Sequence, residues 1–412
     1  YVARIEEARR RDHRRLGREL DLFSFHPLAP ASPFFHPKGA IVYNELIGLM
    51  RELYQKYGYQ EVITPQLFDA ELWKISGHWD NYRENMFLTE VEGREFSFKP
   101  MNCPSHCLIY KSAARSYREL PLRLADFGRL HRFERSGVVQ GLTRVRSFSQ
   151  DDAHIFCMPE HIGPEIDRLF DLMFEVYHLF RFTSPNIYLS TKPEKAIGEP
   201  ELWQHAEATL EACLKNRGVA YTVNPGEGAF YGPKIDFVVH DAIGREWQLG
   251  TIQLDFNLPR RFELTYAAED GSEKTPVMIH RAVLGSIERF FGVMLEHFAG
   301  DLPFWLAPEQ VRVLPVSDKF LEGAQTIGER FRQAGLRASV DSRNEKLGAK
   351  IRDGELAKVP VLLIVGGKEL EQGTVSVRLR HRGDLGAHPV AEVVERLREA
   401  KASRKLAPWE EN

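Results

Sequence analysis

Hydrophobic and polar positions along the chain follow two periods, one typical of helices and one typical of strands. Apolar residues recur at helical spacing in stretches such as 41–57 and 159–180. Shorter runs rich in Phe, Val and Ile indicate strands around 94–99, 122–134, 144–156, 235–241 and 246–256. Residues 34–300 are therefore expected to form one long segment of mixed helices and strands.

A stretch with two prolines, residues 300–308, interrupts this pattern, and a regular alternation follows it. Strand-like runs such as 311–316 then alternate with helical stretches such as 320–335. Such alternation is typical of a small α/β domain with a mostly parallel, mixed sheet. We therefore expect two domains joined by a short stiff linker, over residues 1–306 and 307–412.

Composition narrows the class of protein. The chain has 412 residues, 43% of them hydrophobic, which suits two or three domains at roughly 100–200 residues each. Lys and Arg number 55 against 58 Asp and Glu, so no overall basic field indicates nucleic acid. Four cysteines are too few for a disulfide scaffold, and no apolar run approaches the roughly 18 residues of a membrane span. We expect a cytoplasmic protein.

Two neighbouring strand-like runs carry polar side chains at alternate positions. Successive side chains of a strand point to opposite faces, so Arg132 and Glu134 are expected to share one face. By the same rule Gln150, Asp152 and His154 share a face of the next run. These residues predict a polar pocket, and the alternative is a solvated sheet face without chemistry.

A third strand-like run ends at Gly285, where Ser286 is suited to cap the helix that follows. Arg289 would then lie in the first turn, where a cation opposes the helix dipole by roughly 0.3–1 kcal/mol. A bound anion would remove this conflict. The alternative is that Arg289 points into solvent.

Several cysteines and histidines could bind zinc by residue type, but their spacing does not choose among them. The sequence contains neither a Cys-x-x-Cys pair nor a His-Glu-x-x-His helix. A buried or surface role is the alternative for each. The candidates are Cys103, His106, Cys107, His131, His154, Cys157 and His280.

Taken together, these segments resemble the signature motifs of class II aminoacyl-tRNA synthetases, and specifically of the threonyl-tRNA synthetases. The segments that carry the resemblance are Arg11-Asp-His13, Gly77-His-Trp-Asp-Asn-Tyr82, Lys99-Pro-Met-Asn-Cys-Pro104, Gln150-Asp-Asp-Ala-His-Ile-Phe156, Gly228-Ala-Phe-Tyr-Gly-Pro-Lys-Ile-Asp236, Val277-Met-Ile-His-Arg281 and Arg343-Asn-Glu-Lys-Leu-Gly348. The resemblance implies an α+β catalytic domain built on an antiparallel sheet flanked by helices. It also implies that 307–412 is an anticodon-binding domain, and that the chain is a threonine–tRNA ligase.

The resemblance selects the metal ligands that spacing left open: Cys103, His154 and His280 would hold one catalytic Zn²⁺ per subunit. One thiolate and two imidazoles leave positions for the amine and hydroxyl of threonine. A site that must coordinate a hydroxyl can reject valine by roughly 10⁴–10⁵. By the same resemblance, Asp152 accepts the hydroxyl proton and Tyr231 lies near the amine.

The remaining roles implied by the resemblance concern ATP, its Mg²⁺ and the tRNA. Arg132 would bind the α-phosphate, Glu134 the adenine amino group, and Arg289 the γ-phosphate. His78 would accept a proton near the terminal ribose during transfer. Carboxylate, phosphate and ribose contacts are expected from Gln150, Lys234 and Gln248, with further substrate contacts from Met101, Arg144, Thr251 and Ser286. Anticodon contacts are expected from Asn344, Lys358, Glu369 and Arg378.

The chain departs from the family pattern in two ways. The family carries extra N-terminal domains, one of which hydrolyses seryl-tRNA, and these 412 residues contain no match to them. We therefore expect this polypeptide to charge serine detectably, since one methyl group is worth only ~10–200-fold in discrimination. Ser105 stands where the family has glycine, and we expect it to tighten the site beside zinc or alter inhibitor binding.

The resemblance also implies a homodimer with the region of Pro65 at its interface. Two other functions would use some of the same residues. A catalytically silent, synthetase-like RNA-binding or regulatory paralogue would not need to keep Arg132, Arg289 and the zinc ligands. A zinc hydrolase would need an acid–base glutamate beside the metal, and no metalloprotease-type helix is present in the sequence.

Overall fold

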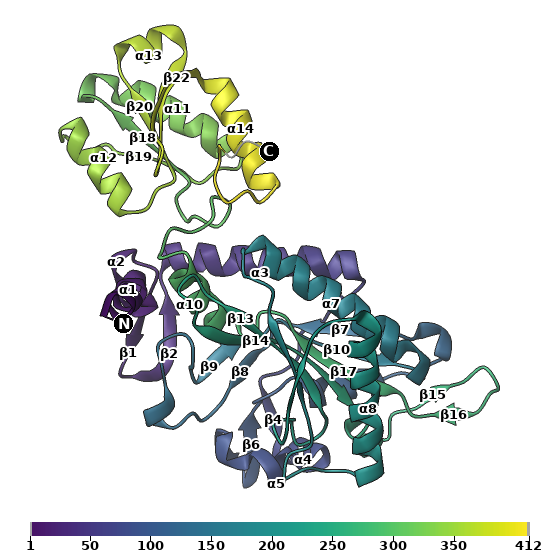
Figure 1. Cartoon of the computed structure of the whole chain (residues 1–412). Helices are drawn as coiled ribbons and strands as arrows, with labels where there is room; N and C mark the ends of the chain where they lie inside the picture. The colour runs from purple at the N-terminus through teal and green to yellow at the C-terminus, as the bar shows by residue number, and fades with distance from the viewer. Residues whose placement is uncertain (1, 410–412) are drawn as a thin grey trace. The chain divides into compact units, whose positions relative to one another are not determined.

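The computed structural model describes residues 2–409 (Figure 1). Contacts within the chain divide it into two compact units. Unit 1 comprises residues 1–24, 34–46 and 294–412, and unit 2 comprises residues 25–33 and 47–293. Helices α3 (Pro37–Tyr57) and α10 (Ile287–His297) contribute residues to both units. Among residues 2–409, no helix combines the length and the apolar character needed to cross a bilayer.

Unit 2 is built on an eight-stranded sheet that is antiparallel except at its two edges, where β12 pairs with β11 and β3 with β7 in parallel. The predicted antiparallel sheet is therefore confirmed. In spatial order its strands are β12 (Thr222–Asn224), β11 (Asn186–Ser190), β13 (Lys234–His240), β14 (Glu246–Asp255), β17 (Val277–Ala282), β10 (Asp152–Cys157), β7 (Leu122–Asp126) and β3 (Gln60–Glu61).

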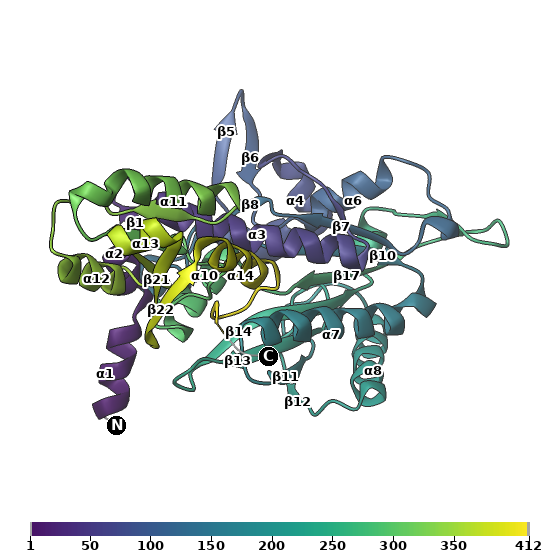
Figure 2. The ribbon, with the colours of Figure 1, turned by 90° about the horizontal axis from the view of Figure 1, so that it is seen from above.

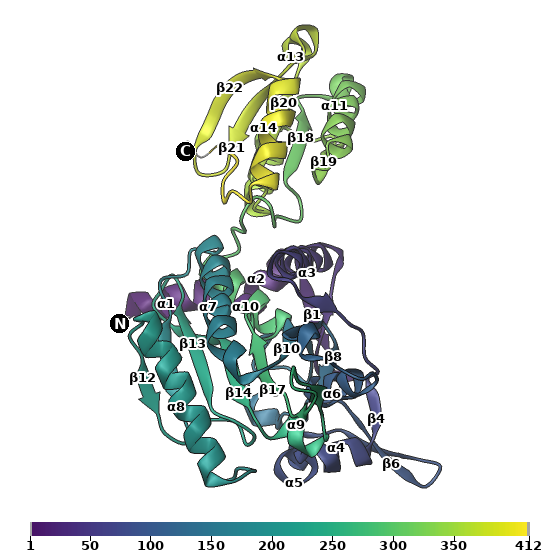
Figure 3. The same cartoon turned by 90° about the vertical axis from the view of Figure 1, so that its right-hand side faces the viewer.

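Helices α7 (Ile162–Leu179) and α8 (Pro200–Arg217) pack together and against β14 (Figure 3). The apolar residues of α7 recur at helical spacing, which buries Leu169, Phe170 and Met173 on one side of the helix. The Phe170 ring lies 5.1 Å from that of Phe237 on β13. This contact fixes the sheet against the helix.

A second group of helices packs together in unit 2. It consists of α4 (Ala70–Ser76), α5 (His78–Tyr82), α6 (Cys103–Lys111) and α9 (Leu258–Arg261), and α9 contacts β17. Three smaller ladders belong to unit 2: β4 (Leu67–Asp69) with β6 (Arg94–Phe98) and β5 (Leu88–Val91), β8 (Arg129–His131) with β9 (Ser147–Ser149), and β15 (Tyr266–Ala267) with β16 (Glu273–Lys274). The β5–β6 hairpin projects from this unit (Figure 2).

The C-terminal part of unit 1 is the predicted α/β fold, with a five-stranded mixed sheet. Strand β18 pairs in parallel with β19 and β20, whereas β20, β21 and β22 pair antiparallel. In spatial order the strands are β19 (Ala338–Val340), β18 (Val311–Pro315), β20 (Val361–Val365), β21 (Thr374–Leu379) and β22 (Gly383–Pro389). The helices are α11 (Leu321–Gln333), α12 (Leu347–Leu356), α13 (Gly367–Gln372) and α14 (Val390–Ala402).

Alternating side chains of this sheet enter two cores. Val313 and Leu363 join Phe331 of α11 and Leu397 of α14 in one cluster, whereas Leu362 belongs to the cluster against α12. The remaining elements of unit 1 are α1 (Val2–Arg11) and α2 (His13–Glu19), and a short ladder of β1 (Phe23–His26) and β2 (Ala29–Phe35) has residues in both units.

Candidate active site

A cavity in unit 2 is built on the central strands β10, β14 and β17, and many of the residues singled out in the sequence line it. Those residues are Met101, Cys103, Arg132, Gln150, Asp152, His154, Tyr231, Thr251 and His280. Gln150, Asp152 and His154 line it together, as the period of two predicts. Leu249, Gln253 and Gly285 also contribute to its wall.

Strand register brings the two histidines of the cavity face to face. Strand β10 pairs with β17 so that His154 lies directly opposite His280. Their rings are 4.7 Å apart at 83°. Cys103 comes from elsewhere, as the first residue of α6. Three segments that are distant in sequence therefore meet at one point.

The donor set of this cluster fits zinc. The ligating atoms of Cys103, His154 and His280 all lie within 4.8 Å of one another, and the three residues are buried. One sulfur and two nitrogens are typical zinc ligands, and three protein ligands leave room for a substrate atom. Burial raises the pKa of the Cys103 thiol and lowers that of the His154 imidazole. Burial thus favours a neutral thiol and a neutral imidazole, and a bound cation would stabilise the thiolate.

Two further residues of the cavity stand close to this cluster. Asp152 accepts a hydrogen bond from the Asn102 amide at 3.1 Å, and burial raises the pKa of its carboxyl group. The Tyr231 ring lies 4.9 Å from that of His280, and burial also raises the pKa of its phenol. An acid and a phenol are therefore positioned next to the three metal-ligand candidates.

Arg132 and Glu134 do not share a strand face, so that prediction was wrong. Strand β8 ends at His131, and the Glu134 N–H donates to the Arg132 carbonyl oxygen at 2.9 Å, which turns the backbone. Arg132 still lines the cavity, with its guanidinium 5.0 Å from the Phe148 ring. Glu134 instead accepts a hydrogen bond from Arg144 Nε at 2.9 Å.

Ser286 caps α10, as predicted. Its hydroxyl oxygen accepts a hydrogen bond from the Arg289 N–H at 3.0 Å. The Arg289 guanidinium donates to the carbonyl oxygens of Gln248 and Thr143, each at 3.0 Å. Arg289 is therefore held by the fold rather than extended into solvent, and burial lowers its pKa.

Asp236 organises a second polar group on β13 and β14, and the sequence interpretation did not assign it a role. Its carboxylate is 2.8 Å from Lys234 Nζ and accepts hydrogen bonds from Gln248 Nε2 at 2.7 Å and Thr251 Oγ1 at 3.2 Å. Lys234 and Asp236 are two positions apart on one strand and so share a face. The spacing of two positions between Lys234 and Asp236 was the feature of the sequence that could have indicated this pair.

Two family models match the chain. The tRNA synthetase class II core domain (G, H, P, S and T) matches residues 87–298, and an anticodon binding domain matches residues 310–400. Curated proteins named threonine–tRNA ligase from Natranaerobius thermophilus and Thermotoga maritima are each 52% identical to this chain, over 400 and 407 residues. The chain belongs to the threonyl-tRNA synthetase family.

Solved structures agree with this family and its class II fold. One, described as the RNA binding domain of threonyl-tRNA synthetase from Cryptosporidium parvum Iowa II, is 44% identical with a TM-score of 0.92, covering 96% of this chain and 98% of that one. A putative threonyl-tRNA synthetase from Aeropyrum pernix is 33% identical with a TM-score of 0.82, covering 96% and 97%. The alignments with the two curated relatives cover 97% and 98% of this chain but 62% and 63% of theirs. The chain thus spans about three fifths of their length.

His78, the expected proton acceptor, lies behind the cavity. Its Nδ1 is 2.8 Å from Ser76 Oγ and its Nε2 is 3.1 Å from Met101 Sδ, while Met101 itself lines the cavity. The Phe230 ring is 5.2 Å away. Burial lowers the pKa of His78 to about 3, so the imidazole is neutral near pH 7.

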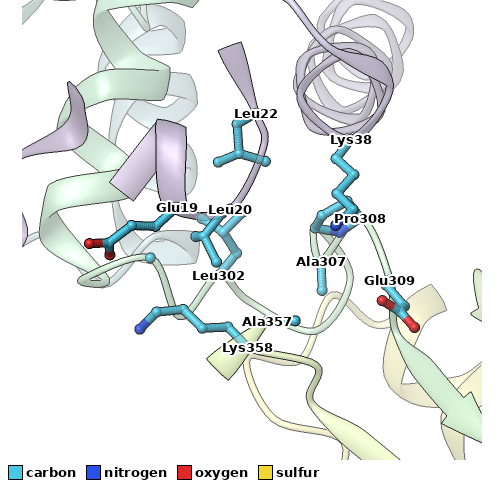
Figure 4. Close-up of a pocket in the computed structure, with 11 residues that line it drawn as sticks. Glu19, Leu20, Leu22, Lys38, Leu302, Ala307, Pro308, Glu309, Ala357 and Lys358 are labelled. Atoms are coloured by element: carbon cyan, nitrogen blue, oxygen red, sulfur yellow. The ribbon is translucent and has the colours of Figure 1, made fainter. Parts of the chain in front are cut away.

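Three of the four residues expected at the anticodon make contacts within unit 1. Lys358 Nζ donates to the Ala299 carbonyl oxygen at 2.8 Å and lines a cavity with Leu20, Leu22 and Leu302 (Figure 4). The other contacts join Glu369 to the Gly366 N–H and the Ser376 hydroxyl, and Arg378 to Glu355. Asn344 is exposed. Lys358, Glu369 and Arg378 thus contact other residues of unit 1. The expected role of all four residues in anticodon binding remains a prediction.

Ser105 lies on the buried side of α6. Its hydroxyl donates to the Asn102 carbonyl oxygen at 2.6 Å and lies 3.3 Å from Thr64 Oγ1. Asn102 in turn holds Asp152. Asn102 therefore links Ser105 to the Asp152 carboxylate in the cavity.

Proposed function

We propose that this chain activates threonine with ATP and transfers it to the 3′ end of threonine tRNA, as a threonine–tRNA ligase. The observation that carries the proposal is the pairing of His154 with His280 across β10 and β17, with Cys103 beside them. This donor set adjoins a cavity lined by an arginine and an aspartate. The names of the curated relatives support the same reaction.

Amino-acid recognition falls to the cluster and its neighbours. Zinc held by Cys103, His154 and His280 would supply a Lewis acid that prefers a substrate with both an amine and a hydroxyl. Asp152 is proposed to accept the hydroxyl proton of threonine, since it lines the same cavity. Tyr231 lines the cavity with its ring beside that of His280, and its phenol is proposed to contact the amine.

Adenylate formation requires cations beside the phosphates. When a carboxylate attacks the α-phosphorus, negative charge grows on the phosphate oxygens, and fixed donors stabilise it. Arg132 lines the cavity and is suited to the α-phosphate. Arg289 is held at the start of α10, where the helix dipole also favours an anion, and is suited to the γ-phosphate. Magnesium would accompany ATP.

The other residues orient the substrates. Gln150 is suited to the threonine carboxylate, and Lys234 to a phosphate oxygen. Gln248 and Thr251 are held by Asp236 in positions suited to the ribose. Further contacts with ATP are proposed for Glu134, Arg144 and Ser286, and Met101 is proposed to contact the amino acid.

The tRNA steps involve His78 and the C-terminal domain. His78 is proposed to accept a proton from the terminal ribose, for which Met101 would have to move aside. We propose that residues 1–306 form the catalytic domain and 307–412 the anticodon-binding domain, with contacts from Asn344, Lys358, Glu369 and Arg378. A homodimer with Pro65 near the interface completes the proposal.

Aminoacylation of tRNA tests this function. The full chain, loaded with zinc, is incubated with ATP, labelled threonine and either threonine tRNA or a tRNA of another specificity. The proposal predicts that threonine tRNA alone becomes charged. If the chain binds threonine tRNA but charges none, it is the RNA-binding paralogue instead.

A further inference from the structure

A line of buried polar groups extends from His154 away from the cavity. His154 Nδ1 is 2.7 Å from His106 Nδ1, and His106 Nε2 is 3.8 Å from Asp126 Oδ2. All three side chains are almost fully excluded from solvent. Neither His106 nor Asp126 is among the residues that line the cavity. The imidazole of His106 therefore contacts the site through His154.

The far end of this line is fixed by a buried ion pair. Asp126 ends β7, and its carboxylate accepts a hydrogen bond from Thr64 Oγ1 at 2.8 Å. Lys99 Nζ lies 3.5 Å from the same carboxylate and donates to Thr64 Oγ1 at 2.7 Å. A buried carboxylate is stable only when charge and hydrogen bonds compensate its lost hydration. Lys99 and Thr64 provide both.

The order of hydrogen-bond donors and acceptors along these groups decides which ring nitrogen of His154 carries no hydrogen. His106 Nε2 lies 3.8 Å from the Asp126 carboxylate, beyond hydrogen-bond distance, and has no hydrogen-bond partner among the described residues. The negative charge of Asp126 nevertheless favours the hydrogen on Nε2, the nitrogen that faces it. In a neutral imidazole, His106 Nδ1 is then an acceptor, and His154 Nδ1 must donate to it. This leaves the lone pair of His154 Nε2, which lies 3.8 Å from Asp152 Oδ1 in the cavity, for a metal ion.

The other histidine of the cluster is oriented more directly. His280 Nε2 is 2.9 Å from Asp255 Oδ2, and Asp255 Oδ1 accepts from the backbone N–H groups of Asn257 and Leu258. Here one carboxylate holds the imidazole, and Nδ1 remains for the metal. The two histidines thus present different nitrogens, each chosen by a buried carboxylate.

From this geometry we infer that His106, with the Asp126 carboxylate behind it, is a positioning residue, which fixes the tautomer and ring orientation of His154 for zinc. The inference rests on the proposed function, since it takes zinc to bind at Cys103, His154 and His280. Outer contacts of this kind typically change metal affinity 10–100-fold. His106 would therefore contribute to zinc binding without touching zinc or substrate.

Two substitutions of His106 distinguish the effect of the hydrogen-bond acceptor at Nδ1 from the effect of the size of the side chain. In His106→Asn the amide oxygen can occupy the position of Nδ1 and still accept from His154. In His106→Gln the amide reaches the position of Nε2, and no acceptor remains at Nδ1. Cys107→Ala is the matched control, because Cys107 is the next residue of α6, is equally buried, and contacts Met278 rather than His154.

Zinc affinity is measured for each folded protein by competition with a chromophoric chelator, and the absorption bands of the Co²⁺-loaded proteins report ligand geometry. We expect His106→Gln to bind zinc about 10–100-fold more weakly, with shifted Co²⁺ bands. His106→Asn and Cys107→Ala should stay close to the native protein in both zinc affinity and the positions of the Co²⁺ bands. Circular dichroism establishes that each variant is folded.

Three outcomes would overturn the inference. Native zinc affinity and native Co²⁺ bands in His106→Gln would show that His154 needs no acceptor. An equal loss in His106→Asn, or in Cys107→Ala, would show that packing of α6 is responsible instead. Absence of zinc uptake by the native chain would refute the zinc site of the proposed function, and this inference with it.

Discussion

Lys234 Nζ lies 2.8 Å from Asp236 Oδ2, and the two side chains project from the same face of β13. The same carboxylate also holds Gln248 and Thr251. One acidic residue therefore orients three groups that are proposed to contact substrates. The side chains of Lys234 and Asp236 are mostly removed from solvent, so the pair is less screened than an ion pair on the surface.

Replacing Asp236 by asparagine should impair threonine activation without unfolding the protein. Hydrogen bonds to charged groups contribute roughly 1.5–3 kcal/mol, so kcat/KM for ATP–pyrophosphate exchange should fall at least about tenfold. Asp270→Asn makes the same change of charge in the turn between β15 and β16 and should leave exchange unchanged. Equal rates for native protein and Asp236→Asn would remove Asp236 from the site.

Removal of zinc should abolish threonine activation but not the fold. Cys103, His154 and His280 join segments that the sheet and α6 already hold in place, so the core of unit 2 does not depend on the metal. Exchange activity and far-ultraviolet circular dichroism are measured before and after chelation and after zinc is restored. Activity that survives chelation would contradict a catalytic metal, as would full activity in Cys103→Ser.

The stability of the zinc-free protein should decrease as the pH falls from about 6.5 towards 3. The folded state holds the pKa of His78 at about 3, because the ring is buried, whereas its ordinary value is 6.5. Between these two pH values the unfolded chain binds a proton at His78 and the folded chain does not. The free energy of unfolding therefore decreases as the pH is lowered. Above pH 6.5 the imidazole is neutral in both states and the contribution is fully present.

His78→Gln should reduce this dependence on pH. The comparison is made by thermal unfolding of the native and variant proteins between pH 7.5 and 4, because other groups also titrate in this range. The loss of stability in acid should be smaller in the variant. Parallel curves for the two proteins would show that His78 titrates normally in the folded state.

Replacing Ser105 by glycine should weaken the site modestly. The substitution removes the hydroxyl that donates to the Asn102 carbonyl oxygen, and Asn102 holds Asp152. Glycine inside a helix is also roughly 0.5–1 kcal/mol less favourable than alanine, and less favourable than serine by a smaller amount. We expect a severalfold rise in the KM for threonine and a lower unfolding midpoint. An unchanged KM for threonine, together with unchanged sensitivity to inhibitors of the site, would mean that the Ser105 hydroxyl does not influence the site.

Much of the fold follows from patterns within single segments. The period of two placed Asp152 and His154 on one face of β10, and the cap at Ser286 marked the start of α10. The same rule failed at Glu134, because a turn after β8 depends on one local hydrogen bond that periodicity does not reveal. Local pattern therefore predicts strands and caps better than it predicts where a strand ends.

The site itself could be predicted only in part. Spacing could not choose the three metal-ligand candidates among seven cysteines and histidines, because they meet through the register of β10 and β17, and only the family resemblance selected them. Asp255 was missed for the same reason, and His106 was named only as one of the seven possible zinc ligands. Asp255 and His106 act through contacts between segments far apart in sequence.

The most direct test of the account is ATP–pyrophosphate exchange by the zinc-loaded chain with threonine, serine and valine in parallel. A site that reads the hydroxyl predicts strong exchange with threonine and exchange with serine that is weaker by roughly 10–200-fold. Valine, which lacks the hydroxyl, should give none that is detectable. Exchange with valine at a rate close to that of threonine would contradict recognition through the metal. No exchange with any of the three, from folded and zinc-bound protein, would contradict the ligase itself.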